Sequence, residues 1–182
     1  MFCIDNCVPL MIQQNINGSN VFNRSWAEFK VGFNDSRGNY WLGNDLLSQP
    51  TLTGRYKLRF DLQSRSNTSN WYSAEYSSFI VQRESTNYRL EVSGYSGNAG
   101  RDALSNQNRK KFTTFDRDND QNSGNCARRW GGGFWYNNCY HCGVNCYDKL
   151  YRSGLQGFAW NGLPGGVRLW SSRMWLQCKS VH

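Results

Sequence analysis

The chain has 182 residues, a formal net charge of +8, and aromatic and charged residues at 15% and 19% of its composition. This length suits one domain with a sizeable core. The aromatic content excludes a disordered chain, and heptads typical of a coiled coil are missing. The basic residues are scattered without a nucleic-acid-binding motif, and the tightest runs are 109–111 and 128–129. We therefore expect no nucleic-acid partner, while acidic polysaccharide stays open.

The seven cysteines indicate disulfides and hence an oxidising compartment. Four of them lie between residues 126 and 146, and the odd total predicts one thiol that is unpaired or bonded to another chain. Glycosylation sequons at residues 17, 23, 34 and 67 agree with secretion. No apolar run approaches the ~20 residues that span a bilayer. We also expect no signal peptide, because Cys3, Asp5 and Cys7 interrupt its apolar region, so a secreted protein would be a mature chain or a fragment here.

In chain order, residues 23–30 predict a helix with Ser25 as its cap and Glu28 completing a capping box. Alternating apolar side chains predict strands at residues 55–62, 78–81 and 88–92, and a short helix is expected at 102–105. After Phe112 the chain becomes rich in Gly, Asn, Asp and Cys up to residue 168. A stretch of this length with little regular structure is usually functional or cross-linked.

The segment from Asp116 to Gly124 alternates oxygen-bearing side chains, a pattern that suits Ca²⁺ with its six to eight oxygen ligands. It is not an EF-hand, because Gln121 and Ala127 stand where that loop needs Gly and Glu. The alternative is an acidic turn neutralised by Arg117 and Arg128. Spacing alone leaves both interpretations open.

Several longer motifs occur in a fixed order along the chain. They are, upstream, Tyr40-Trp-Leu-Gly-Asn-Asp45 and Gly94-Tyr-Ser-Gly-Asn-Ala-Gly100 and then Lys111-Phe-Thr-Thr-Phe-Asp-Arg-Asp-Asn-Asp120, Asn125-Cys-Ala127 and Gly132-Gly-Phe-Trp-Tyr-Asn-Asn-Cys139. Together these motifs resemble the fibrinogen C-terminal (fibrinogen-related) domain family, and among its members most of all the ficolin and tachylectin lectins. The resemblance runs from about residue 11 to 177. It implies an α+β fold with a central, mainly antiparallel sheet, short helices and a loop-rich lobe that carries calcium and ligand. We expect one domain over 1–182, with a divergent or truncated part at 1–10, a sheet-forming part at 11–112 and the lobe at 113–177.

The resemblance also implies a calcium site and a disulfide. Its ligands would be the side chains of Asp118 and Asp120 and the backbone carbonyls of Asn122 and Gly124, with Asp116 just outside. Cys126 and Cys139 match the disulfide that follows this loop in the family. A cis peptide is expected between Asn138 and Cys139.

In the ficolin-like lectins, backbone N–H groups after this cis peptide meet the acetyl group of a ligand. Here the donors would be Cys139 and Tyr140, with Trp130 as one aromatic wall and Tyr147 or Tyr151 as a second. His141 belongs to the expected ligand set although it is displaced by one position. In a chain this aromatic, most rings are core, and Trp135 and Tyr136 are assigned there.

The stretch after Cys139 departs from the family pattern, because Cys142 and Cys146 are extra cysteines. They suit either a local disulfide or a Zn²⁺ site completed by Cys139 and His141. At the ends of the chain, Cys3–Cys7 and Cys7–Cys178 are both conceivable pairings.

We expect a secreted, non-enzymatic recognition domain, because no hydrolase, metalloprotease or nucleotide-binding motif occurs. The resemblance implies a calcium-dependent lectin for acetylated glycans or cell-surface carbohydrate, acting in pattern recognition and innate immunity. The alternatives are a protein-binding module, either a receptor ligand or a peptide-binding pocket, and an adhesive matrix module. Oligomerisation is expected through regions outside this chain.

Overall fold

The computed structural model describes residues 8–151 and 154–179. Its helices are α1, α2 and α3, with three short 3₁₀ turns, and its strands are β1 to β9. The helical elements are η1 (Asn20–Phe22), α1 (Trp26–Val31), α2 (Asn44–Thr51), η2 (Glu84–Thr86), η3 (Ser105–Gln107) and α3 (Cys126–Trp130). The strands are β1 (Leu10–Ile16), β2 (Phe33–Asn34), β3 (Tyr40–Trp41), β4 (Tyr56–Ser64), β5 (Trp71–Val81), β6 (Leu90–Gly97), β7 (Lys149–Tyr151), β8 (Gly154–Gln156) and β9 (Leu169–Cys178).

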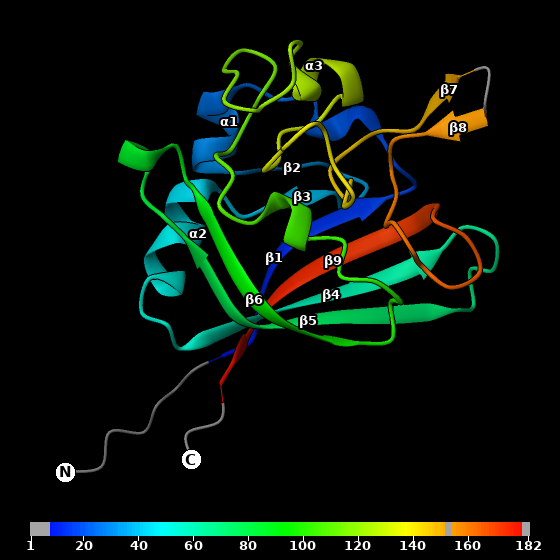
Figure 1. The fold of residues 1–182 in the computed structure, drawn as a ribbon, viewed down its shortest axis with the longest axis horizontal. Helices are drawn as coiled ribbons and strands as arrows, with labels where there is room; N and C mark the ends of the chain where they lie inside the picture. The colour runs from blue at the N-terminus through cyan, green and yellow to red at the C-terminus, as the bar shows by residue number, and fades with distance from the viewer. Residues whose placement is uncertain (1–7, 152–153, 180–182) are drawn as a thin grey trace.

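The centre of the fold is a seven-stranded sheet in the order β2-β3-β1-β9-β4-β5-β6, with antiparallel pairing between neighbours. Helices α1 and α2 lie toward one end of this sheet, and the loops around α3 stand above it (Figure 1). This is the expected α+β fold. Strand β9 falls within the segment that the sequence analysis placed in the loop-rich lobe, yet it lies between β1 and β4 in the middle of the sheet.

Helix α1 begins as the sequence predicts. The Ser25 hydroxyl accepts a hydrogen bond from the Glu28 backbone N–H, and the Glu28 carboxylate accepts one from the Ser25 N–H, which completes the capping box. Other predicted elements shift in length: β5 begins seven residues before the predicted strand, and the expected helix at 102–105 is a 3₁₀ turn at 105–107. Helix α2 and strand β1 were not predicted.

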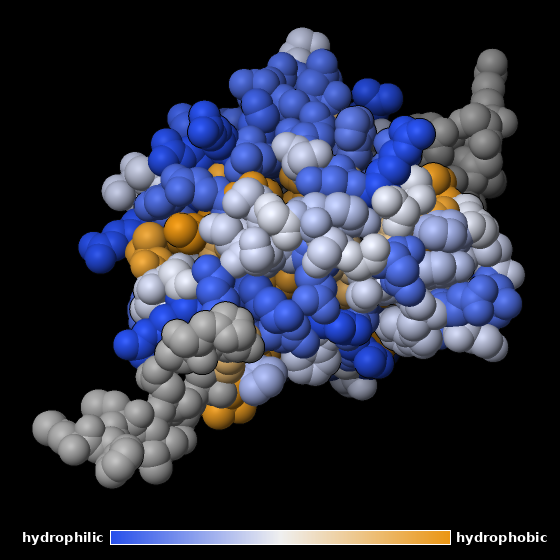
Figure 2. All heavy atoms as spheres, turned by 60° about the horizontal axis from the view of Figure 1, so that its bottom comes forward, coloured by the Kyte–Doolittle hydropathy of each residue, from blue (hydrophilic) through white to orange (hydrophobic). Residues whose placement is uncertain are grey.

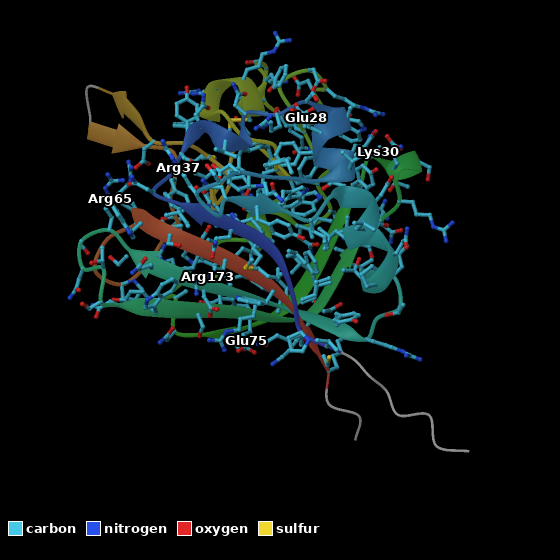
Figure 3. All side chains as sticks on the ribbon, turned by 180° about the vertical axis from the view of Figure 1, so that it is seen from behind. Glu28, Lys30, Arg37, Arg65, Glu75 and Arg173 are labelled. Atoms are coloured by element: carbon cyan, nitrogen blue, oxygen red, sulfur yellow. A yellow bond between two sulfur atoms is a disulfide. The ribbon has the colours of Figure 1, made fainter. Side chains whose placement is uncertain are left out.

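One face of the sheet carries ion pairs between neighbouring strands and a contact between an arginine and an aromatic ring. Arg59 bonds both Asp61 at 2.8 Å and Glu75 at 3.0 Å, and Arg173 lies over the Trp71 ring at 5.0 Å. Figure 3 shows Glu75 and Arg173 on this face, seen from behind. Such half-exposed ion pairs contribute little each. Figure 2 shows a second face on which small apolar patches are separated by hydrophilic side chains.

The core is built largely on aromatic rings, and Phe112 lies at its centre. This ring is fully buried and packs at 5.1–6.2 Å, centroid to centroid, against Trp26, Phe29, Trp41 and Trp135. Trp135 and Tyr136 are also fully buried, which confirms their assignment to the core. Phe112 therefore joins α1, β3 and the loop-rich segment at the point where that segment begins.

We predict that Phe112→Ala lowers the free energy of unfolding by about 3–5 kcal/mol, because it deletes a buried ring and leaves a cavity. Urea denaturation measures this, with Leu46→Ala as the control. Leu46 is 53% exposed on α2, so its truncation is expected to change stability by no more than about 0.5 kcal/mol. A loss below about 1 kcal/mol for Phe112→Ala would contradict the central place given to this ring.

Candidate functional site

The loop between Asp116 and Gly124 is curled by its own side chains. The carboxylate of Asp118 accepts from the Asp120 N–H at 3.2 Å, and that of Asp120 accepts from the Asn122 N–H at 2.9 Å. The Asn122 side-chain oxygen in turn accepts from the Gly124 N–H at 2.9 Å. Three successive turns of this kind bring the predicted calcium ligands onto one short loop.

Asp118 and Asp120 place two carboxylates close together in this loop, so each disfavours the charge of the other. Burial raises the pKa of Asp120, and the neighbouring negative charge of Asp118 raises it further, against hydrogen bonds from the Cys126 and Asn122 N–H groups. A cation beside two carboxylates reverses such a shift, because it favours their ionised form. The oxygen-rich donor set of the loop therefore fits a hard cation.

Asp116, unlike Asp118 and Asp120, bonds residues outside the curled part of the loop. One of its oxygens accepts from the Trp26 backbone N–H at 2.9 Å and from the Thr114 hydroxyl at 2.7 Å, so it ties the loop to the start of α1. The next residue, Arg117, lies over the Trp26 ring at 4.0 Å and donates to the Asn87 side chain at 2.8 Å. The loop is therefore held on the core from its first two residues.

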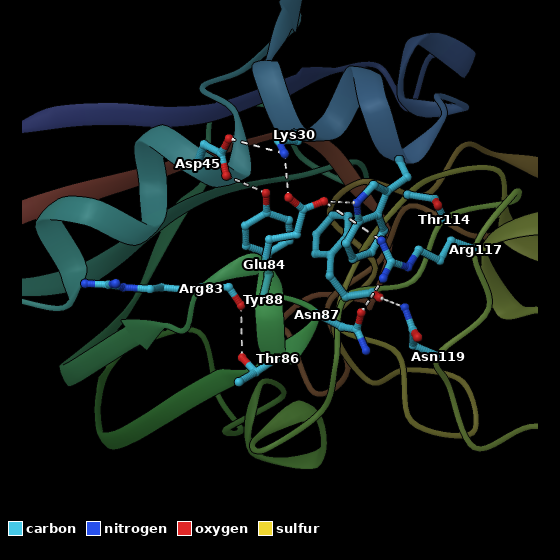
Figure 4. Close-up of polar contacts among 12 residues, drawn as sticks. Lys30, Asp45, Arg83, Glu84, Thr86, Asn87, Tyr88, Thr114, Arg117 and Asn119 are labelled. Atoms are coloured by element: carbon cyan, nitrogen blue, oxygen red, sulfur yellow. Dashed lines mark hydrogen bonds and ion pairs between the residues drawn. The ribbon is translucent and has the colours of Figure 1, made fainter.

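Glu84 completes this attachment from η2 (Figure 4). Its carboxylate accepts from the Trp26 indole N–H at 2.8 Å and forms an ion pair with Lys30, while Arg117 lies 3.9 Å away. The hydrogen bond from Lys30 and then that from Trp26 lower the pKa of Glu84. The charge of Glu84 thus favours the arrangement in which α1 and the loop lie together.

At the other end of the loop, Cys126 and Cys139 form the expected disulfide, which confirms that pairing. The Asn138–Cys139 peptide bond is cis, also as expected. Cys126 begins α3, which Asn125 caps by accepting from the Arg128 N–H at 2.8 Å. The disulfide therefore joins the end of the loop at 116–124 to the segment of Asn138 and Cys139.

Two cavities, of about 320 Å³ and about 280 Å³, both have Tyr140 in their lining. The first, of about 320 Å³, is hereafter the Cys139 cavity, and its lining residues are Asn122, Arg129, Trp130, Asn138, Cys139 and Tyr140. Trp130 and Tyr140 pack edge to face at 5.3 Å, and Trp130 is only 9% exposed. Much of its ring is therefore covered, and amide and guanidinium groups make up much of the remaining wall.

The structure brings Trp130, Cys139 and Tyr140 together as predicted, whereas two other candidates, His141 and Tyr147, do not line the Cys139 cavity. His141 lines the second cavity, together with Arg168. The Tyr147 ring lies against Gly131, where an added Cβ would come within 1.7 Å of it, and Gly131 has a φ of 70°. The side chain of Tyr151 lies outside the described residues. The ligand roles of His141 and Tyr147 stay predictions.

Asn122 connects the loop to the Cys139 cavity. Its side-chain N–H donates to the Asn138 side-chain oxygen, while its backbone carbonyl belongs to the predicted calcium set. The sequence analysis predicted for Asn122 only that its carbonyl binds calcium. It placed Asn138 at the expected cis peptide and Arg129 in the basic pair at 128–129, and it gave neither side chain a binding role. The adjacent arginines at 128–129 were the available signal, but only the fold shows which of them reaches the cavity.

Cys142 and Cys146 are buried and are not joined to each other, so the alternative of a local disulfide between them is wrong. Burial raises the pKa of the Cys142 thiol, which disfavours the thiolate that a metal would need. The zinc alternative also fails, since Cys139 is in its disulfide and no cluster of three His, Cys, Asp or Glu side chains suited to a metal occurs among the described residues. Cys178 is disulfide-bonded, and the pairings proposed for Cys3 and Cys7 lie outside the described residues.

Fold and site together define an α+β domain whose candidate binding surface lies on loops attached to the central sheet. The model of the family "Fibrinogen beta and gamma chains, C-terminal globular domain" matches residues 4–178, and the chain belongs to this family. The solved fibrinogen-like globe domain of human ANGPTL2 is similar with a TM-score of 0.82 and 37% identity, over 97% of this chain and 82% of that one. Lamprey fibrin D-dimer, complexed with Gly-His-Arg-Pro-amide, has a TM-score of 0.77 and 28% identity, over 94% and 63%.

Among curated proteins, chicken tenascin is 38% identical over 80% of this chain and human angiopoietin-related protein 7 is 37% identical over 86%. This chain spans only 8% of that tenascin and 45% of that angiopoietin-related protein. These relatives support the family and its matrix and protein-binding branches, and they do not show the closeness to ficolin and tachylectin lectins expected from the motifs. In the described part of the chain, no helix is both long and apolar enough to cross a membrane.

Proposed function

We propose that this chain is an extracellular recognition domain that binds a protein or peptide in the Cys139 cavity, with Ca²⁺ in the adjacent loop. The observation that carries the proposal is the cavity itself, which lies beside the loop and shares Asn122 with it. The Cys126–Cys139 disulfide supports an oxidising compartment. The proposal is one of recognition rather than catalysis.

The polar character of the cavity favours a protein partner over an acetylated sugar. An acetyl methyl needs an open apolar wall, whereas Tyr140 packs against the largely buried Trp130. The groups left along the cavity are amides and a guanidinium, which suit the polar groups of a peptide. The relatives named as tenascin and angiopoietin-related protein, and the peptide in the lamprey fibrin structure, support the same choice.

Calcium is proposed for the loop because its donors are oxygens and because burial and the neighbouring Asp118 charge raise the pKa of Asp120, which a bound cation would reverse. Binding to the native state alone stabilises the fold by about 2.7 kcal/mol at a hundredfold excess over Kd. In a domain of this size, that predicts a rise in melting temperature of about 5–10 °C in millimolar Ca²⁺. Asp118→Asn combined with Asp120→Asn should abolish the rise, because it removes both charges while keeping side-chain oxygens.

Differential scanning calorimetry measures this effect, with Mg²⁺ as the ion control and Asp35→Asn as the variant control. Asp35 bonds the Asn39 side chain in a separate turn, so Asp35→Asn should leave the calcium response unchanged. A melting temperature indifferent to chelation in the wild type would contradict the calcium proposal.

The recognition proposal is tested by filling the cavity. Peptides selected from a random displayed library in Ca²⁺ should lose at least about tenfold in affinity for Asn138→Trp, because the added ring occupies the space a hot-spot side chain would fill. Asn70→Trp adds the same ring at an exposed turn and should bind as the wild type does. Biolayer interferometry provides the affinities.

Equal binding to both tryptophan variants would contradict use of the Cys139 cavity. Selection of no peptide, together with binding of N-acetylglucosamine that Asn138→Trp abolishes, would instead favour the lectin interpretation.

A further inference from the structure

The lining of the Cys139 cavity carries positive charge without negative charge among the described residues. Among the lining residues that the structure describes, Arg129 alone carries a formal charge, and no carboxylate is among them. A guanidinium offers five N–H donors and no acceptor. Arg129 lies over the Trp130 ring at 5.2 Å, so the cation is held next to the aromatic wall rather than extended away from it. The guanidinium of Arg129 is therefore the charged donor group in the lining of this cavity.

Asn138 adds donors of the same kind. Its side-chain oxygen accepts from the Asn122 side chain, so this amide is already oriented by its acceptor end. Its Nδ2 group has no hydrogen-bond acceptor within residues 8–151 and 154–179, which leaves two N–H donors for a ligand. An occupant that supplies acceptors thus matches both Arg129 and Asn138.

The surroundings increase this bias when the loop holds its cation. Calcium offsets the charges of Asp118 and Asp120, and the Lys110 ammonium bonds the Gln121 side chain at 3.0 Å on the same loop. The whole chain has a net charge of +8. Clefts lined by one sign of charge attract ligands of the opposite sign and raise their association rates.

We propose that the Cys139 cavity binds a carboxylate of a protein partner, the side chain of a Glu or Asp, with Arg129 as the residue that sets this specificity. The carboxylate accepts from the Arg129 guanidinium and the Asn138 amide, and the edge-to-face pair of Trp130 and Tyr140 contacts the methylene stem. This inference rests on the proposed function and adds the chemical class of the bound group. It also predicts rejection of cationic peptides such as Gly-His-Arg-Pro-amide, the ligand in the lamprey fibrin structure.

The test uses two probes of nearly equal shape, N-acetyl-L-glutamate α-amide and N-acetyl-L-glutamine α-amide, titrated calorimetrically into the whole chain in Ca²⁺. We expect the acidic probe to bind about tenfold more tightly, because hydrogen bonds between ions are roughly twice as strong as neutral ones. Arg129→Gln should remove the preference. Gly-His-Arg-Pro-amide should bind neither protein at this site.

Arg128→Gln is the matched control. Arg128 is the neighbouring arginine, but its side chain donates to the Phe115 carbonyl at 2.7 Å and does not line the cavity. It should therefore keep the preference for the acidic probe. A melting curve in Ca²⁺ identifies any variant whose loss reflects unfolding, and Arg129→Lys, which keeps the charge without the planar fork, should retain part of the preference.

Equal affinity for the two probes, or a preference that survives Arg129→Gln, overturns the inference. If library-selected peptides still lose their binding to Asn138→Trp in that case, the recognition function of the cavity stands and only its preference for carboxylate fails. If those peptides also bind Asn138→Trp unchanged, the proposed function fails with it.

Discussion

The packing of Phe112 among aromatic rings is the constraint on which the arrangement of this domain depends. Its ring is fully buried against Trp26 of α1, Trp41 of β3 and Trp135 of the loop-rich segment. The next residue, Thr113, then pairs with Phe134 in an isolated antiparallel bridge. Phe112 and Thr113 therefore fix the chain where it leaves the sheet, so the start of the following loop is held against the core.

From that point the loop and the Cys139 cavity form one continuous unit. Asp116 and Arg117 attach the start of the loop to α1, whereas the Cys126–Cys139 disulfide joins its end to the cavity. Asn122 links the two through its side chain. Because both ends are held, a cation bound by the loop would stabilise the same backbone that shapes the cavity, which is how the proposed calcium would support the proposed recognition.

Local patterns predicted part of this architecture, and tertiary pairing determined the rest. The capping box at Ser25 and the alternation in β4 were predicted because neighbouring residues encode them, whereas the Cys126–Cys139 pairing was predicted only from the resemblance to the family. Strand β9 was missed as a strand because it pairs with β1 and β4, which are distant in sequence. The site could not be predicted in full for a similar reason. Residues 128 and 129 are both arginine, so the sequence does not distinguish them, yet in the fold only Arg129 lines the cavity.

The claim that the loop and cavity act as one site that combines a cation with a carboxylate is tested most directly by a crystal structure grown with Ca²⁺ and N-acetyl-L-glutamate α-amide. We predict anomalous density for one cation between Asp118 and Asp120, and the probe carboxylate within hydrogen-bonding distance of Arg129. Density for the cation at another place, or a probe bound away from the Cys139 cavity, would contradict the account.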